Sequence, residues 1–385
     1  MRGYIRRRTK DSWQITVELP RAADGKRRQR FVTVNGVKRD AQAKLAQLLH
    51  EINVGTYIDP TNLTLAEYLN KWLEHARAGN TVTGKTWDEY RKIIQSHLGP
   101  HLGHVPLSSL KPLHIQAYYA DRLKRGRIRK SRQEERPGLS PQTVVHHHTL
   151  LHKALQDAVR WQLVPTNPAD AVDPPKIAKQ EMKILDREGI KKLVERSMSS
   201  PYYIAVVIAV STGMRRGEIL ALRWEDVDLE SGQIMVSKSL QQTHGRALAV
   251  KGTKTGKTRV IPISGKTVQE LKRHRGAQAQ NKLLLASDYQ DNGLVCCRTD
   301  GSFIVPDLLT NSFTRIVDRA GVNRVRFHDL RHTHVALLIA QGEHVKVISE
   351  RLGHSSISIT MDRYGHLFPS LNRSAADKFD EALGW

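Results

Sequence analysis

The period of the apolar residues changes along the chain, and this change divides it into three parts. Over residues 13–19 apolar residues alternate with polar ones, which predicts a β-strand. From about residue 61 the apolar residues recur at helical spacing, and from about residue 184 helical and strand patterns are mixed. The chain of 385 residues is also longer than one ordinary domain. We therefore expect a multidomain α+β protein.

The first predicted domain, residues 1–58, is a small three-stranded sheet followed by a helix. The strands are expected at Gly3–Arg8, Trp13–Leu19 and Arg27–Val34, and the helix at Asp40–Ile52. A small basic sheet of this kind fits the major groove of DNA, whereas the alternative is a solvated basic tail. The side chains predicted to contact DNA are Arg6, Arg7, Arg8, Lys26, Arg27, Arg28 and Arg30.

The second predicted domain, residues 61–174, is all helical. Thr64 with Glu67 three residues later forms a capping box, which marks the start of its first helix. Ser140 followed by Pro141 opens its last helix. We expect the second helix to run from near Lys85 to His97, with Gly99-Pro100 and Gly103 breaking it, because proline lacks the amide hydrogen that a helix interior needs. A polar linker follows up to about residue 183.

The third predicted domain, residues 184–372, is mainly helical and contains a small antiparallel sheet. Its strands are expected at Gln233–Ser239, Ala247–Lys251 and Arg259–Ile263, between apolar helical segments. Residues 373–385 form a C-terminal tail.

The charge balance indicates a polyanionic partner. Lys and Arg total 61 against 38 Asp and Glu, a formal net charge of +23, and nucleic acid is the commonest partner of such a chain. No run of 18 apolar residues exists, so no membrane contact is expected. The N-terminus lacks the apolar stretch of a secretory signal, and the two cysteines, Cys296 and Cys297, are adjacent. These features predict a cytoplasmic protein.

The sequence gives no support for metal or nucleotide chemistry. Metal-dependent nucleases need clustered carboxylates, but the acidic residues are scattered, with Asp226 and Asp228 as the nearest pair. His148 and His152 lie one helical turn apart without a further ligand at metal spacing. The segment 252–257 resembles a phosphate-binding loop but lies between two predicted strands rather than before a helix. We expect no metal and no cofactor.

A set of cations and one tyrosine carries the chemistry. It includes a Thr212–Glu218 segment of the form TG-x-R-x-x-E, a His-x-x-Arg segment, and a Leu-Gly-His turn ten residues before the tyrosine. The candidate catalytic residues are Arg215, Lys254, His328, Arg331, His354 and Tyr364. In this order and at these separations, the set resembles the tyrosine recombinase (phage integrase) family over roughly the C-terminal half of the chain.

The residue types suit metal-free attack on a phosphodiester. Negative charge builds on the non-bridging oxygens, and planar guanidinium groups match those oxygens in a bidentate manner. By resemblance, Arg215 and Arg331 bind the phosphate, with Glu218 orienting Arg215. The resemblance further makes Tyr364 the nucleophile and His328 its base. It assigns a hydrogen bond to the phosphate to His354 and protonation of the leaving 5′ oxygen to Lys254, with Lys251 and Lys257 as rival candidates for that acid.

The resemblance implies a site-specific recombinase that acts through a 3′-phosphotyrosine intermediate. It would integrate, and with a partner excise, a mobile element such as a prophage or conjugative transposon. The helical domain looks like a core-binding domain and the N-terminal sheet like an arm-binding domain, so core and arm sites in double-stranded DNA are expected. A homotetramer is expected in the synapse, and an excisionase and a DNA-bending host protein are candidate partners.

Four alternatives stay open at this point. A type IB topoisomerase uses similar chemistry but does not join two DNA molecules. An Xer-type resolvase generally lacks the N-terminal sheet. A non-catalytic DNA-binding regulator would leave the filled catalytic positions unexplained. A metal-dependent nuclease would require Mg²⁺ and would stop in EDTA.

Overall fold

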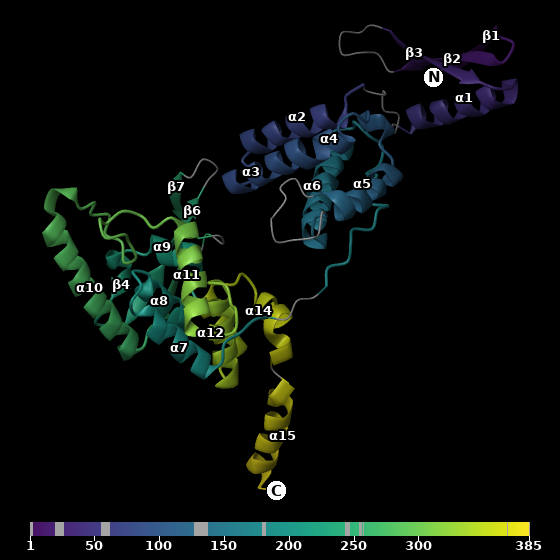
Figure 1. Ribbon diagram of the computed structural model, residues 1–385. Coiled ribbons are helices and arrows are strands. Elements are labelled where there is room, and N and C mark those ends of the chain that lie inside the picture. Colours follow the sequence, from purple (N-terminus) through teal and green to yellow (C-terminus); the bar gives the residue numbers. More distant parts are fainter. Residues whose placement is uncertain are drawn as a thin grey trace. The chain divides into compact units, whose positions relative to one another are not determined.

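The computed structural model places most of the chain in two compact units, residues 1–178 and 179–385 (Figure 1). The two segments predicted as separate N-terminal domains both lie in the first unit. None of the described helices is both long and apolar enough to cross a membrane. The described residues are 3–19, 27–54, 62–126, 138–178, 182–242, 247–253, 256, 258–367 and 369–384.

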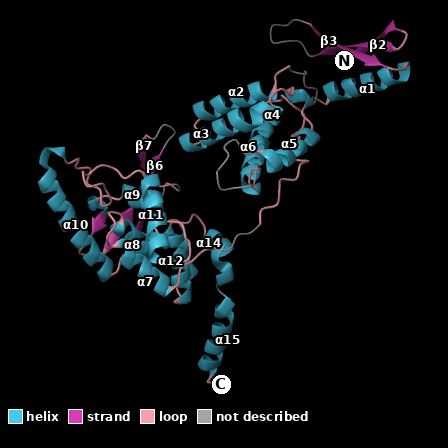
Figure 2. Cartoon of the chain, in the orientation of Figure 1, coloured by secondary structure: helices cyan, strands magenta, loops and turns pink. Residues whose placement is uncertain are grey.

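The first unit begins with an antiparallel sheet in the order β1-β2-β3, followed by a helix (Figure 2). Its elements are β1 (Gly3–Thr9), β2 (Ser12–Leu19), β3 (Arg28–Asn35) and α1 (Lys38–Asn53). Ile15 and Val17 of the central strand are fully buried and pack in one cluster with Leu48 of α1. The predicted sheet and helix are confirmed, because the alternation in β2 places one apolar face against α1.

The rest of the first unit is helical, as predicted. Thr64 caps α2: its hydroxyl accepts the Glu67 amide at 3.3 Å, and the Glu67 carboxylate accepts the Thr64 amide at 2.9 Å. Ser140 caps α6 through the Thr143 amide at 3.2 Å. The helices are α2 (Leu65–Ala78), α3 (Gly84–Ile93), α4 (Gly99–Leu102), α5 (Pro112–Arg125) and α6 (Pro141–Arg160), with the 3₁₀ turn η2 (Leu107–Ser109) before α5.

The break expected at Gly99-Pro100 is wrong, whereas Gly103 does end the helical segment, as the C-cap of α4. A π-helical turn, η1 (Ile94–Leu98), follows α3 directly and leads into α4. Pro100 then stands in the first turn of α4, where a missing amide hydrogen breaks no bond. The chain therefore continues helically to Leu102.

The second unit is mainly helical and also contains two small antiparallel sheets (Figure 2). The helices are α7 (Arg187–Ser197), α8 (Tyr203–Thr212), α9 (Arg216–Ala221), α10 (Gly265–Leu285), α11 (Pro306–Ala320), α12 (Asp329–Ala340), α13 (Val345–Leu352), α14 (Ile357–Tyr364) and α15 (Pro369–Leu383). The strands are β4 (Val227–Asp228), β5 (Gln233–Val236), β6 (Lys238–Gln242), β7 (Leu248–Gly252) and β8 (Arg259–Pro262). Short 3₁₀ turns are η3 (Trp224–Asp226), η4 (Ala286–Asp288) and η5 (Gly365–Leu367).

The strand predicted at Gln233–Ser239 is two strands in two different sheets. β5 pairs with β4 and β8, whereas β6 pairs with β7. Buried residues alternate at Ile234 and Val236, but the next position in that alternation is the half-buried Lys238, and burial resumes at Leu240. The polar segment Ser237–Ser239 therefore interrupts the apolar alternation at the point where the pairing partner changes.

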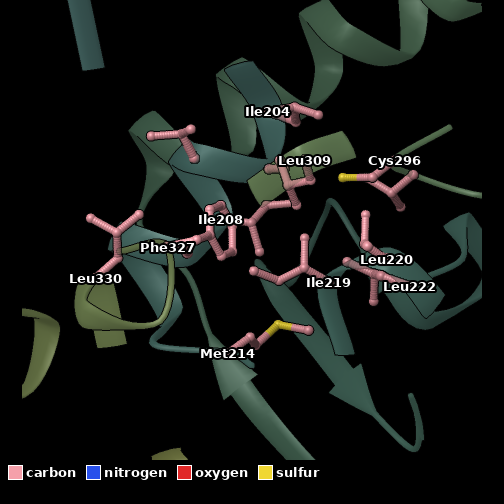
Figure 3. Close-up of a cluster of buried hydrophobic side chains, with 14 of the residues drawn as sticks. Ile204, Ile208, Met214, Ile219, Leu220, Leu222, Cys296, Leu309, Phe327 and Leu330 are labelled. Carbon is pink, nitrogen blue, oxygen red and sulfur yellow. The ribbon is translucent and has the colours of Figure 1, made fainter. Parts of the chain in front are cut away.

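Helix α8 lies in the core of the second unit and is apolar almost all round, as a fully buried helix should be. Figure 3 shows Ile204 and Ile208 of α8 together with Leu309, Phe327 and Leu330 from other segments. Because α8 is packed in the core, its position is fixed. The residues that follow its C-terminus, from Gly213 to Arg215, therefore start from a fixed point.

Candidate active site

The turn after α8 positions Arg215. Gly213 ends α8 with φ of +66°, and a Cβ there would lie 2.8 Å from the His334 ring, so only glycine fits. Arg215 follows as the N-cap of α9, with extended backbone. Its amide donates to the Glu218 carboxylate at 2.9 Å and its guanidinium donates to the same carboxylate at 2.8 Å. The contact expected between Glu218 and Arg215 is thus present.

Glu218 also binds a second arginine, which the sequence did not single out. Arg259 of β8 donates from Nη2 to the Glu218 carboxylate at 2.6 Å and from Nε to the Arg351 carbonyl at 3.0 Å. The Glu218 side chain is 1% exposed. Its burial acts to raise the pKa of the carboxyl, but the hydrogen bonds and charges of Arg259 and Arg215 outweigh burial and hold that pKa below its usual value.

Arg331 of α12 ties together two helix ends. It is 4% exposed and donates to the Gly213 carbonyl at 2.8 Å and to the Leu352 carbonyl at 2.7 Å. These carbonyls close α8 and α13, where the helix dipole favours a cation. Burial, followed by the charge of Arg215, lowers the pKa of Arg331 to about 9. Arg331 is still a cation at neutral pH.

The Leu-Gly-His turn at the end of α13 brings His354 close to Arg331 and Arg215. Gly353 ends α13 with φ of +65°, and a Cβ there would lie 2.9 Å from Cδ of Arg259. The His354 ring then bonds through Nδ1 to the Thr360 hydroxyl at 2.8 Å. Burial, with the charges of Arg331 and Arg215, lowers the pKa of His354 to about 4. Without a ligand this ring is therefore neutral, with Nε2 available for another partner.

His328 stands at the start of α12, as its N-cap, one turn before Arg331. The residue is exposed at the surface, but its ring lies against the His332 ring, with centroids 5.4 Å apart. Desolvation by this surrounding protein, with the charges of His332 and Arg331, lowers the pKa of His328 to about 4. A negative phosphate beside the ring would raise that pKa again.

Tyr364, the last residue of α14, is buried. It is 1% exposed, and its hydroxyl is hydrogen-bonded to Nδ1 of His332 at 2.7 Å. Burial raises the pKa of the phenol, while the nearby charges of Arg331 and Arg363 act in the opposite direction. His332 was not among the residues that the sequence singled out.

The structure therefore gathers five of the six predicted catalytic residues. Arg215, Arg331, His328, His354 and Tyr364 lie near enough to influence each other's charge. Lys254 lies outside the described residues, as does its rival Lys257, whereas Lys251 is exposed on β7. Among the described side chains, no three histidine, cysteine or acidic groups cluster as a metal site.

The predicted DNA-contacting residues lie on the N-terminal sheet, except Lys26, which is outside the described part. Arg6 and Arg8 are exposed on β1, and Arg27 and Arg28 are exposed at the start of β3. Arg7 turns back along the strand to the carbonyls of Thr9 and Lys10, and Arg30 is half-buried. The sheet therefore presents its exposed basic groups from two strands.

Comparison with known proteins assigns the chain to a family. Residues 183–370 match the model of the Phage integrase family, and residues 64–123 match the Phage integrase, N-terminal SAM-like domain. The ICEBs1 integrase of Bacillus subtilis (strain 168) is 32% identical over 253 residues, which cover 64% of this chain and 67% of that protein. The chain belongs to the phage integrase family. It is a site-specific tyrosine recombinase of mobile elements, an enzyme that breaks and rejoins DNA.

Other relatives of the recombinase cover nearly the whole chain. A "Tyrosine recombinase XerC-like" protein of Caldanaerobacter subterraneus subsp. tengcongensis is 28% identical over 397 residues, covering 97% of this chain and 96% of that protein. Among solved structures, the Tn1549 transposon integrase bound to circular-intermediate DNA has a TM-score of 0.68 at 19% identity, covering 82% of this chain and 99% of that one. A λ integrase tetramer bound to a Holliday junction has a TM-score of 0.56 at 18% identity, covering 91% and 95%. These two structures share the fold.

Proposed function

We propose that the recombinase integrates a prophage or conjugative element, and excises it with a partner, through a 3′-phosphotyrosine intermediate. The observation that carries this proposal is the convergence of Arg331, Arg215 and two neutral histidines beside a buried tyrosine. Arg331 donates hydrogen bonds to two backbone carbonyls. Among the described residues, no carboxylate forms an ion pair with it. Its charge therefore remains available for an anion.

In this mechanism the cations meet the charge that develops on the scissile phosphate. The guanidinium groups of Arg215 and Arg331 bind non-bridging oxygens, and His328 and His354 donate further hydrogen bonds to them. Both arginines are fixed before DNA arrives, Arg215 by Glu218 and Arg331 by the carbonyls of Gly213 and Leu352. Such preorganised cations give the phosphate a binding site without a metal ion.

Tyr364 attacks the phosphorus, and the 5′ oxygen leaves with a proton that we assign to Lys254. The phosphodiester energy is kept in the tyrosine ester, so a 5′-hydroxyl from a second DNA strand reverses the step without ATP. By family resemblance, His328 is the base that accepts the proton of Tyr364. The contacts of Tyr364 point to a different acceptor, His332.

Covalent trapping tests the proposal. The wild-type enzyme is incubated in EDTA with nicked DNA duplexes taken from beside its gene, because loss of the short cleaved fragment prevents religation. A denaturant-stable adduct, mapped by peptide mass spectrometry to Tyr364, is expected. An adduct on another residue, or cleavage that requires Mg²⁺, would refute the mechanism. Joining of two different DNA molecules separates recombination from topoisomerase activity.

Replacing Arg331 by Lys is expected to slow cleavage by about 10²–10³-fold, because one ammonium cannot hold two carbonyls and a phosphate in the geometry of a planar fork. The measurement is the single-turnover rate of adduct formation on nicked DNA at saturating enzyme. Arg315→Lys, on an exposed position of α11, is the matched control and should cleave at the wild-type rate. Equal rates for Arg331→Lys and wild type would remove Arg331 from the site.

The N-terminal sheet is proposed to bind arm sites, separate from the cleavage site. Deleting residues 1–58 should weaken binding to distal arm DNA while cleavage of core DNA continues. Log affinity falls as log salt concentration rises. For each phosphate that the truncated protein no longer neutralises, this negative slope should become shallower by about 0.9. Gel shifts with separate arm and core duplexes measure both effects. Unchanged arm binding and salt slope in the truncated protein would refute this assignment.

Strand exchange between two duplexes is proposed to involve a homotetramer, acting in the cytoplasm with an excisionase and a DNA-bending host protein. Of the C-terminal tail predicted at residues 373–385, residues 373–383 lie in α15. This helix leaves Phe379 63% exposed and Leu383 47% exposed. We propose that this apolar surface docks on a neighbouring protomer, as family tails do.

A further inference from the structure

Resting on the proposed function, we infer that His332, rather than His328, takes the proton from Tyr364. A general base must lie within about 2.6–3.2 Å of the proton that it removes. Nδ1 of His332 lies 2.7 Å from the Tyr364 hydroxyl, and the two rings are 5.6 Å apart. His328 instead contacts the His332 ring edge to face, with the ring centroids 5.4 Å apart.

In the protein without DNA, the described hydrogen-bond partner of the buried Tyr364 hydroxyl is a side chain, His332. Tyr364 is 1% exposed, so bulk water does not reach it, and its neighbours Val335, Ile348 and Leu352 are apolar and buried. His332 lies between this closed cluster and a 510 Å³ cavity that its own side chain lines. The cavity is also lined by Arg326, whose side chain is 81% exposed, so it reaches the surface. His332 thus connects the buried hydroxyl to solvent.

The protonation states fit this transfer. Desolvation lowers the pKa of His332, opposed by Asp329, so the ring is neutral near pH 7 and accepts a proton. The tautomer with hydrogen on Nε2 leaves the Nδ1 lone pair for the Tyr364 hydroxyl. As the phenolic oxygen bonds to phosphorus, its proton moves to Nδ1 and Nε2–H releases a proton to cavity water. The leaving 5′ oxygen receives its own proton from the general acid, so the charges balance.

Several charged groups surround His332 and set its titration. Asp329 and Arg331 lie on its own helix, Arg326 precedes that helix, and Arg363 approaches from α14. The cavity adds Lys183 and Arg324, and the His328 ring packs against the His332 ring. Only Asp329 favours the protonated ring, and it is already paired with Arg326 at 2.8 Å. The positive surroundings keep the base neutral and help it to release the proton afterwards.

His332→Asn tests the inference, because the Asn amide retains a hydrogen-bonding atom near the Nδ1 position but does not take a proton. We expect single-turnover cleavage about 10²-fold slower at pH 7. Wild-type cleavage should be flat above the pKa of His332 and fall below it. In His332→Asn the proton must go to hydroxide, so the rate should rise about tenfold per pH unit, in the range below the pKa of Tyr364.

Three further measurements separate a base from a structural histidine. DNA substrates with a bridging 5′ sulfur need no proton on the leaving group, so they should rescue a Lys254→Ala variant but not His332→Asn. Added imidazole, entering through the cavity, should accelerate His332→Ala. His334→Asn is the matched control, since His334 is a buried histidine of the same helix that bonds the Val210 carbonyl at 2.8 Å. It should lose stability but keep the wild-type pH profile.

Each outcome decides the inference. A His332→Asn enzyme that is slow but keeps the wild-type pH profile would make the histidine merely structural. If His328→Asn loses the pH dependence of cleavage while His332→Asn keeps the wild-type rate and pH profile, then His328 is the base. Failure of the wild-type enzyme to form any adduct would instead overturn the proposed function, so the two failures are distinguishable.

Discussion

Replacing Tyr364 by Phe is expected to abolish the covalent adduct while DNA binding persists. The substitution removes one oxygen and keeps the ring that packs in the cluster of Val335, Ile348 and Leu352. The variant loses a hydrogen bond to His332, which typically contributes about 0.5–1.5 kcal/mol to stability, so it should remain folded. The adduct should disappear on denaturing gels while a gel shift shows the wild-type affinity for the same duplex.

The pH dependence of that binding gives a second readout. The pKa of His328 and the pKa of His354 are both lowered to about 4 in the free enzyme. A bound phosphate raises both values, so DNA binding takes up protons, and the affinity of Tyr364→Phe should increase as the pH falls from about 7 to about 5. The residue after Tyr364 is a glycine, so the adjacent position offers no substitute nucleophile. A residual adduct in Tyr364→Phe would therefore place the nucleophile elsewhere in the chain.

The sequence predicted those parts of the site that local geometry determines. His328 and Arg331 are one helical turn apart, and Gly213 and Gly353 stand where the backbone takes positive φ at helix ends. The type and spacing of these residues indicate their arrangement before any tertiary contact is known. The capping box at Thr64 was predictable for the same reason.

The missed residues depend on tertiary contacts. Arg259 reaches Glu218 from a strand 41 positions away, and no local pattern marks that distance. His332 directly follows Arg331, and consecutive helical residues point about 100° apart, so a role beside the same phosphate was not expected. Only the approach of α14 brings Tyr364 to His332. The change of sheet at Ser237 was missed because the predicted strand was continued into the polar segment Ser237–Ser239.

Replacing Arg259 by Met is expected to have the largest effect on stability. The Arg259 side chain is 10% exposed and the Glu218 side chain 1%, so this ion pair is buried. Breaking a buried ion pair typically costs about 3–5 kcal/mol, and we expect the lower end of that range because Arg215 still pairs with Glu218. Met keeps an unbranched stem beside Gly353 but loses the bonds to Glu218 and to the Arg351 carbonyl. The catalytic unit should unfold at a clearly lower urea concentration than in the wild-type protein.

Two controls identify burial as the cause. Arg273→Met breaks an exposed ion pair with Glu270 and should cost less than about 1 kcal/mol. In the double variant Glu218→Gln with Arg259→Met, no buried carboxylate has lost a cationic partner, so the loss should be smaller than the sum of the single losses. Hydrogen exchange of α9 and β8 in the full chain locates the effect. Additive losses would mean that the pair contributes only through packing. Arg215 would then owe its position to the turn at Gly213 rather than to the charge network around Glu218.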